Sequence, residues 1–200
     1  TVMNRQRLLD TLAAFAQCNE TPGEGVTRFS WSAADTQAKQ LLQGMCEASG
    51  LEVRIDGIGN LRARLRGKTA GPAVLVGSHL DSVRHGGALD GIYGVCAGLE
   101  ALRSFVDEGF EPACDVELIA FAEEEGSNFG CTCLGSKAVT GVADAVFLHD
   151  LHDDASSAYE RVRAAGLNPD ALPSQQIDAT YARAYLEVHI EQNARLEQQG

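Results

Sequence analysis

Hydrophobic residues recur along this chain with two periods, one typical of helices and one typical of strands. Residues 4–17 carry apolar side chains at helical spacing, and residues 32–50 repeat that pattern. Residues 51–56 and 60–65 alternate apolar with polar positions, and glycines between them favour a turn. These patterns predict two helices followed by a β-hairpin.

Continuous apolar runs follow at 73–79 and 115–122, and such runs indicate strands buried on both faces. A helix rich in small residues is predicted between them at 91–106, and the alternating segment 184–192 predicts a last strand. Residues 167–183 contain two prolines and favour a surface connection. Further helices are predicted near 132–140 and 155–165. Strands that alternate with helices predict an α/β fold, with a largely parallel central sheet inside a three-layer α/β/α domain.

The charge balance narrows the classes of partner. The chain has 200 residues, with 28 acidic and 16 basic side chains and a net charge of -12. An acidic chain lacks the basic surface that a phosphate backbone or an anionic membrane requires, so we expect neither nucleic acid nor membrane as a partner. Six scattered cysteines without a CxxC pair are expected to be reduced and mostly buried, including the close pair Cys131 and Cys133. The N-terminal residues lack the features of a secretory signal, and we expect a cytoplasmic protein.

Polar clusters stand at the ends of the predicted strands or within them. Their titratable members are His79, Asp81, Asp90, Glu123, Glu124, Glu125 and His189. Ligands of open α/β sheets gather where the strands end, so we expect these side chains to converge. Crowded carboxylates repel one another, and divalent cations relieve that repulsion. Histidine and carboxylate ligands together suit zinc, manganese or cobalt.

Each cluster also has a purely structural interpretation. A histidine at a strand end is often only hydrogen-bonded, adjacent glutamates are usually solvated, and Asp90 among glycines is typical of a turn. The position of the acidic triplet directly after the run LIAFA favours a site instead. His85, His149 and His152 have weaker contexts, and we expect them to be structural or exposed.

Longer motifs resemble those of one enzyme family. GSHLDSVRHGGALDGIYGV, FAEEEGSNFG followed by LGSK, and YLEVHIEQ resemble the M20-like metal-dependent amidohydrolases. The branch of closest resemblance contains N-carbamoyl-L-amino-acid hydrolases, allantoate amidohydrolases and β-ureidopropionases. The similarity covers nearly the whole chain. It implies a zinc-exopeptidase-like catalytic domain with a dinuclear metal site, acting on amide or ureido C–N bonds other than peptide bonds.

The resemblance also implies the ligands of two divalent cations, which would be zinc, manganese or cobalt. His79 and His189 would hold one cation and Glu125 the other, with Asp90 bridging both. The substrate would be a small molecule.

Three further roles are implied by the same motifs. Glu124 would be the general base, Asp81 would orient His79, and Gln192 would lie near the substrate. The base would accept a proton from the attacking water and return it to the leaving nitrogen.

The chain departs from the family pattern in two residues and in length. Asn128 stands where the family usually has arginine, and Asn193 stands where it usually has glycine. Family members are much longer, continue into a lid-and-dimerisation domain, and then return to supply a last metal-ligating histidine. The resemblance therefore implies that residues 1–200 are the N-terminal part of the catalytic domain, incomplete at its C-terminus, of an enzyme that is a homodimer when full length.

Two other functions stay open. One is an M20-type aminopeptidase or deacylase, although the related peptidases usually place a carboxylate where this chain has His189. The other is an incomplete piece that binds metal and catalyses nothing.

Overall fold

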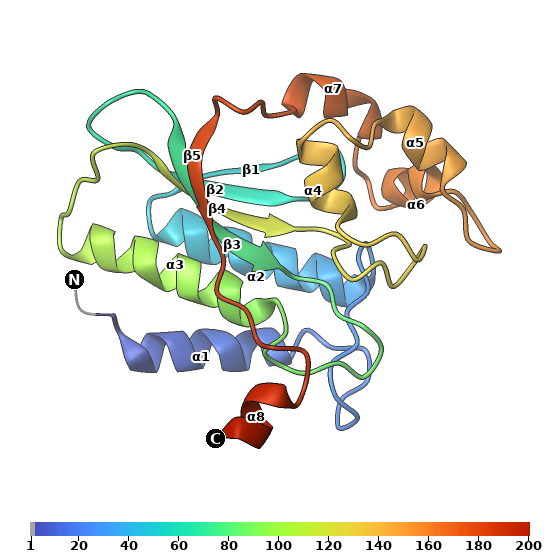
Figure 1. The fold of residues 1–200 in the computed structure, drawn as a ribbon, viewed down its shortest axis with the longest axis horizontal. Coiled ribbons are helices and arrows are strands. Elements are labelled where there is room, and N and C mark those ends of the chain that lie inside the picture. Colours follow the sequence, from blue (N-terminus) through green and yellow to red (C-terminus); the bar gives the residue numbers. More distant parts are fainter. Residues whose placement is uncertain (1–2) are drawn as a thin grey trace.

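The computed structural model describes residues 3–200 and combines a central sheet with helices (Figure 1). The strands are β1 (Glu52–Ile55), β2 (Leu61–Leu65), β3 (Ala73–His79), β4 (Val116–Phe121) and β5 (Ala182–Leu186). The longer helices are α1 (Arg5–Ala16), α2 (Ala33–Ala48) and α3 (Ile92–Asp107). The shorter ones are α4 (Leu134–Val139), α5 (Ala145–Asp150), α6 (Ala158–Ala164), η1 (Pro169–Ala171), α7 (Leu172–Gln175) and α8 (Arg195–Gln199).

The strands form a sheet in the order β1-β2-β4-β3-β5. β3 lies between β4 and β5 and runs parallel to both, whereas β2 is antiparallel to its neighbours β1 and β4. β1 and β2 form the predicted hairpin, and the prediction of an α/β fold is confirmed. Because β3, β4 and β5 run in one direction, they all end at the same edge, which we call the carboxyl edge of the sheet.

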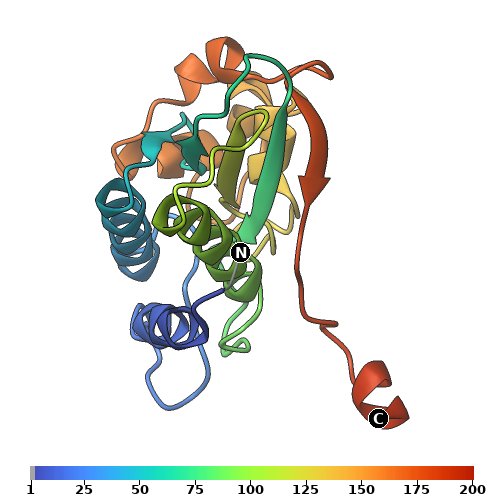
Figure 2. The same ribbon diagram turned by 90° about the vertical axis from the view of Figure 1, so that its left-hand side faces the viewer.

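Helices α1, α2 and α3 lie on one side of the sheet (Figure 2). Leu99 and Leu102 of α3 are fully buried in the main hydrophobic core, together with Leu118 of β4. Gly98 allows α3 to approach the sheet closely, because a Cβ atom at this position would lie 2.8 Å from Leu118 Cδ1. This packing places the start of α3 against the end of β3.

A second hydrophobic cluster joins the short helices of the C-terminal part. Its buried members include Ile58, Leu134, Leu148, Val162 and Leu172. The prediction of a surface connection over 167–183 is therefore correct only in part, because η1 and α7 lie within it and bury Leu172. None of the helices described in residues 3–200 has the length and apolar character needed to cross a membrane.

The face of the sheet that points away from α3 is only partly covered. Leu75, Ile119, Phe121 and Tyr185 line a cavity of about 360 Å³ between this face and α4. Tyr185 of β5 is 41% exposed. Apolar surface of this kind on a folded chain commonly marks a place where further protein packs.

The cysteines are free thiols, as expected. Cys18, Cys46, Cys96 and Cys114 are buried. Cys131 and Cys133 are half-buried in the loop before α4, and Cys131 packs against the second hydrophobic cluster, as the prediction that this pair packs requires. The ammonium group of Lys137 contacts the Cys131 thiol, with Nζ 3.5 Å from Sγ.

Glu117 of β4 is the centre of a buried ion-pair network. Its carboxylate pairs with Arg62 and Arg64 on β2 and with Arg54 on β1. The hydroxyl of Tyr181 donates a hydrogen bond to Glu117 Oε2 at 2.6 Å. Burial alone would raise the pKa of Glu117, but the arginines and Tyr181 together lower it below its ordinary value. The network therefore joins the hairpin to β4 through an ionised side chain.

Replacing Glu117 with glutamine should destabilise the protein at neutral pH. Removing one partner of a buried ion pair costs roughly 3–5 kcal/mol, because the remaining charges stay buried. The stabilising contribution of ionised Glu117 is present above the ordinary glutamate pKa and is lost as the pH falls through the lowered native pKa. Denaturant unfolding of both proteins over an acidic-to-neutral pH series measures the difference. Equal free energies of unfolding at neutral pH would contradict this account.

Candidate metal centre

His79 is the last residue of β3, and its side chain is fully buried. Its Nδ1 lies 2.9 Å from the carbonyl oxygen of Asp81. Since a carbonyl only accepts hydrogen bonds, Nδ1 carries the proton and Nε2 keeps a free lone pair. Gly91 packs against this ring with a φ of +67°, and a Cβ atom on Gly91 would lie 2.5 Å from it. Only glycine fits between the ring and the start of α3.

Asp81 orders the acidic loop that follows β4. Its Oδ1 accepts a hydrogen bond from the backbone N–H of Glu124 at 3.0 Å, and its Oδ2 accepts one from Glu125 at 3.1 Å. The carboxylate itself lies 3.7 Å from His79 Nδ1, so the Asp81 carbonyl is the closer group to the ring. Burial raises the pKa of Asp81. Asp81 thus joins the end of β3 to the end of β4.

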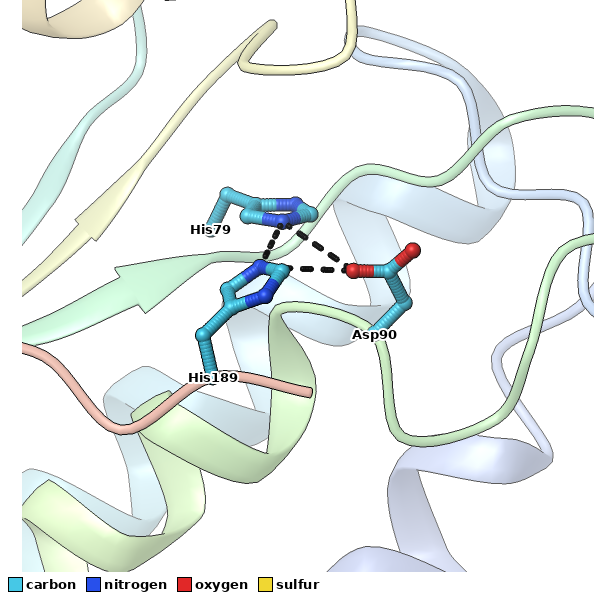
Figure 3. A group of neighbouring side chains, drawn as sticks. All are labelled: His79, Asp90 and His189. Atoms are coloured by element: carbon cyan, nitrogen blue, oxygen red, sulfur yellow. Dashed lines mark hydrogen bonds and ion pairs between the residues drawn. The ribbon is translucent and has the colours of Figure 1, made fainter. Parts of the chain in front are cut away.

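Asp90 and His189 face His79 from two other segments of the chain (Figure 3). His189 Nε2 lies 3.2 Å from His79 Nε2 and 3.3 Å from Asp90 Oδ1. His189 Nδ1 lies 2.8 Å from the carbonyl oxygen of Ile190, which again leaves Nε2 as the free acceptor. Asp90 Oδ1 is buried and has no hydrogen-bond partner among residues 3–200. When both rings are neutral and carry their protons on Nδ1, three acceptor atoms face one another here.

The predicted last strand ends earlier than its sequence pattern suggests. The prediction of a strand over 184–192 is wrong beyond Leu186, where β5 ends. The alternation of apolar and polar residues continues to His189, but the backbone pairing with β3 does not. A pattern of side chains cannot show where that pairing stops. His189 consequently lies in an irregular segment beyond the strand.

The glutamates after β4 have different surroundings. Glu124 Oε2 lies 3.7 Å from His79 Nε2, and Glu125 belongs to the same cluster. Glu123 is fully buried at a φ of +52° and accepts hydrogen bonds from the backbone N–H and the Nδ2 of Asn128. Burial raises the pKa of Glu123 to about 7. Glu124 and Glu125 face the candidate centre, whereas Glu123 anchors the loop from inside.

These side chains fit a divalent cation. One ligand atom from each of His79, Asp90 and His189 lies within 4.8 Å of the others, and the same holds for His79, Glu124 and Glu125. Asp90 Oδ1 and the two Nε2 atoms each offer a lone pair of electrons. Oxygen and nitrogen ligands of this kind suit zinc, manganese or cobalt. Burial and the neighbouring Asp90 raise the pKa of Glu125, and a cation would relieve this cost.

Gln192 forms hydrogen bonds with two of the candidate ligands. Its Nε2 donates to Asp90 Oδ2 at 2.7 Å and to Glu125 Oε1 at 2.8 Å. These residues border a cavity of about 650 Å³ that Val83 and Leu89 also line. A molecule in this cavity would meet an amide, apolar side chains and the candidate ligands together.

Residues outside the predicted site hold these loops in place. The hydroxyl of Ser30 accepts a hydrogen bond from the backbone N–H of Glu123, and Cys133 Sγ lies 3.4 Å from Glu124 Oε1. Ser30 comes from a distant segment and Cys133 from the far end of the same loop, so no local pattern indicates either contact. Glu187 also contacts the end of β3, and its spacing of two residues from His189 was a usable signal.

Comparisons with known proteins show which families this chain is similar to. Residues 60–193 match the family model of peptidase family M28. The chain is 37% identical over 196 residues to N-carbamoyl-L-amino acid amidohydrolase of Geobacillus stearothermophilus, covering 98% of this chain and 48% of that protein. It is 36% identical over 202 residues to allantoate amidohydrolase of Escherichia coli (strain K12), with coverage of 98% and 48%. The crystal structure of a hydantoinase/carbamoylase family amidase from Burkholderia ambifaria superimposes with a TM-score of 0.87 at 34% identity, covering 99% of this chain and 48% of that one.

An α/β sheet whose strands end in histidines and carboxylates defines a domain of the metallohydrolase class. The chain belongs to peptidase family M28. Its resemblance to N-carbamoyl-L-amino-acid and allantoate amidohydrolases is confirmed, whereas the matching family model is M28 rather than M20. The chain spans about half the length of the relatives that it matches.

Replacing Gly91 with alanine should weaken metal binding by displacing the His79 ring, which a new Cβ atom would contact at 2.5 Å. We expect a loss of affinity of roughly 10–100-fold, the range typical of residues that orient metal ligands. Cobalt titration followed by visible absorbance measures the affinity. Gly87→Ala is the matched control, because a Cβ atom at Gly87 meets nothing within 4 Å. Equal affinities in Gly91→Ala and the unmodified chain would show that the ring position does not matter.

Proposed function

We propose that this chain carries the metal centre of a hydrolase for linear amide or ureido C–N bonds, of the N-carbamoyl-amino-acid or allantoate type. The observation that carries the proposal is the convergence of His79, Asp90 and His189 beside Glu124 and Glu125. The names of the similar proteins support the same reaction class.

In this proposal the carboxyl edge would hold two divalent cations, which would be zinc, manganese or cobalt. His79 and His189 would be ligands of one cation and Glu125 of the other, and Asp90 would be a ligand of both. The surroundings of the Asp90 carboxylate support this division. Its Oδ1 faces the two histidines, whereas its Oδ2 shares the Gln192 amide with Glu125.

Cations bound there would polarise the scissile carbonyl and make the attacking water acidic near neutral pH. Glu124 accepts the proton of that water and returns it to the leaving nitrogen. Its side chain is 33% exposed and its Oε2 lies 3.7 Å from His79 Nε2, so it can meet both solvent and the candidate centre. Asp81 positions this base through the backbone N–H of Glu124. Gln192, at the border of the 650 Å³ cavity, contacts the substrate.

An aminopeptidase or deacylase is the second candidate, because the family is named for peptidases. His189 favours the first candidate, because related peptidases usually have a carboxylate where this chain has a histidine. Assays of one preparation against N-carbamoyl amino acids, allantoate, acylated amino acids and dipeptides separate the two. Faster cleavage of the dipeptides would favour the peptidase.

We also propose that residues 1–200 form the N-terminal part of a catalytic domain in a cytoplasmic enzyme that is a homodimer when full length. The relatives are about twice as long as the part that the chain covers. The partly covered sheet face around Ile119 and Phe121 is suited to pack further protein.

Glu124→Gln should abolish turnover while leaving metal content nearly unchanged. Glutamine keeps the shape of the side chain but cannot accept the proton, and loss of a general base costs roughly 10²–10⁴-fold in rate. Turnover is measured in a longer, active protein that contains residues 1–200. Metal content is measured by elemental analysis. A near-normal kcat would contradict the role of Glu124 and make Glu123 the next candidate.

Residues 1–200 alone should show little or no turnover. With the ligands assigned in this proposal, the second cation would have only Asp90 and Glu125 among the described residues, both carboxylates, so its binding should be weak. The test is ammonia release from N-carbamoyl amino acids and allantoate after loading with zinc, manganese or cobalt. Full-length allantoate amidohydrolase of Escherichia coli serves as the positive control. Comparable turnover by the two proteins would refute the incomplete-site argument.

A further inference from the structure

The position of His189 is not explained by the sheet. The pairing of β5 with β3 ends at Val76 opposite Leu186, three residues before His189. The chain then leaves the sheet (Figure 2), and residues 187–189 are exposed. Even so, His189 Nε2 lies 3.2 Å from His79 Nε2. Something other than the backbone ladder must fix this distance.

Side-chain hydrogen bonds around Glu187 supply such a constraint. The hydroxyl of Ser78 donates to Glu187 Oε1 at 2.6 Å, and Ser78 is the residue directly before His79. The hydroxyl of Tyr185, inside β5, donates to Glu187 Oε2 at 2.9 Å. One carboxylate therefore connects the end of β3 with the last part of β5. Hydrogen bonds to an ionised acceptor are stronger than those between neutral groups.

Helix α3 contacts the backbone of the residue after Glu187. A Cβ atom on Gly94 of α3 would lie 2.3 Å from the carbonyl oxygen of Val188 and 2.8 Å from the Cβ of Ser78. The first turn of α3 thus lies against both Ser78 and the segment that carries His189. With the helix on one side and the Glu187 carboxylate on the other, the segment has little freedom to move away from His79.

We infer that Glu187 is a positioning residue, which holds His189 opposite His79 by joining Ser78 to Tyr185. The inference rests on the proposed metal centre and adds to it a residue outside the ligand set. Glu187 does not need to touch a cation or the substrate for this role. Its effect should appear as a change in metal affinity and ligand geometry, because a histidine that is free to move binds a cation less tightly.

The experiment compares cobalt binding by the unmodified chain and by Glu187→Ala, using visible absorbance for both affinity and coordination geometry. We expect Glu187→Ala to lose roughly 10–100-fold in affinity and to show an altered cobalt spectrum. Glu187→Gln should restore part of the affinity, because its amide can still bond one of the two hydroxyls. Ser78→Ala should weaken binding in the same direction, and its effect should not add to that of Glu187→Ala.

Glu191→Ala is the matched control. It removes the same charge at the same spacing of two residues from His189, but Glu191 bonds the backbone N–H of Leu196 instead of β3. If Glu191→Ala and Glu187→Ala lost the same amount of cobalt affinity, the loss would come from the missing negative charge alone. This result would overturn the inference. Thermal unfolding and circular dichroism show whether each variant is folded.

The possible outcomes separate this inference from the proposed function. If the unmodified chain binds cobalt and Glu187→Ala binds it with the same affinity and spectrum, Glu187 does not position His189. A lower melting temperature with unchanged cobalt binding would make Glu187 a stabilising residue only, and would also overturn the inference. If the unmodified chain binds no cobalt, the proposed metal centre fails and the positioning role fails with it.

Discussion

Carboxylates and imidazoles crowd together at the carboxyl edge of the sheet, and much of the surrounding structure serves to hold them there. Buried charges are costly unless they are paired or hydrogen-bonded. The Asp81 carboxylate meets this cost with two backbone N–H groups from the loop after β4. Asp90 Oδ1 and the Nε2 atoms of His79 and His189 face one another without a donor. The cations that we propose would supply positive charge among these atoms.

The pKa of Glu117 is shifted in the opposite direction to the pKa values of the carboxylates at the carboxyl edge. Glu117 is surrounded by arginines that lower its pKa, as expected for a side chain that stabilises a fold. Asp81 and Glu125 have raised pKa values, since burial dominates at the carboxyl edge. Groups with raised pKa values that gather at strand ends are typical of functional sites. The same sheet therefore supports a stabilising network in its hairpin and, at its carboxyl edge, the cluster that we propose as the metal centre.

Patterns that depend on local sequence predicted the fold well. The buried runs that became β3 and β4, the hairpin and the helix α3 follow from periodicity, and the convergence of strand ends follows from topology. Features set by distant contacts were not predictable in this way. The end of β5 depends on where pairing with β3 stops, and the exposure of Cys133 depends on how the loop before α4 packs. The contact of Asp81 with His79 through a carbonyl likewise depends on a backbone path that residue types do not specify.

The most direct test of the central claim is to locate a bound cation. Crystals of the chain grown with zinc or cobalt, with anomalous diffraction recorded on both sides of the metal absorption edge, would show where it binds. The account predicts an anomalous peak in contact with His79 Nε2, His189 Nε2 and Asp90 Oδ1, and its loss in His189→Ala. A peak at another place, or none beside these three side chains at saturating metal, would contradict it.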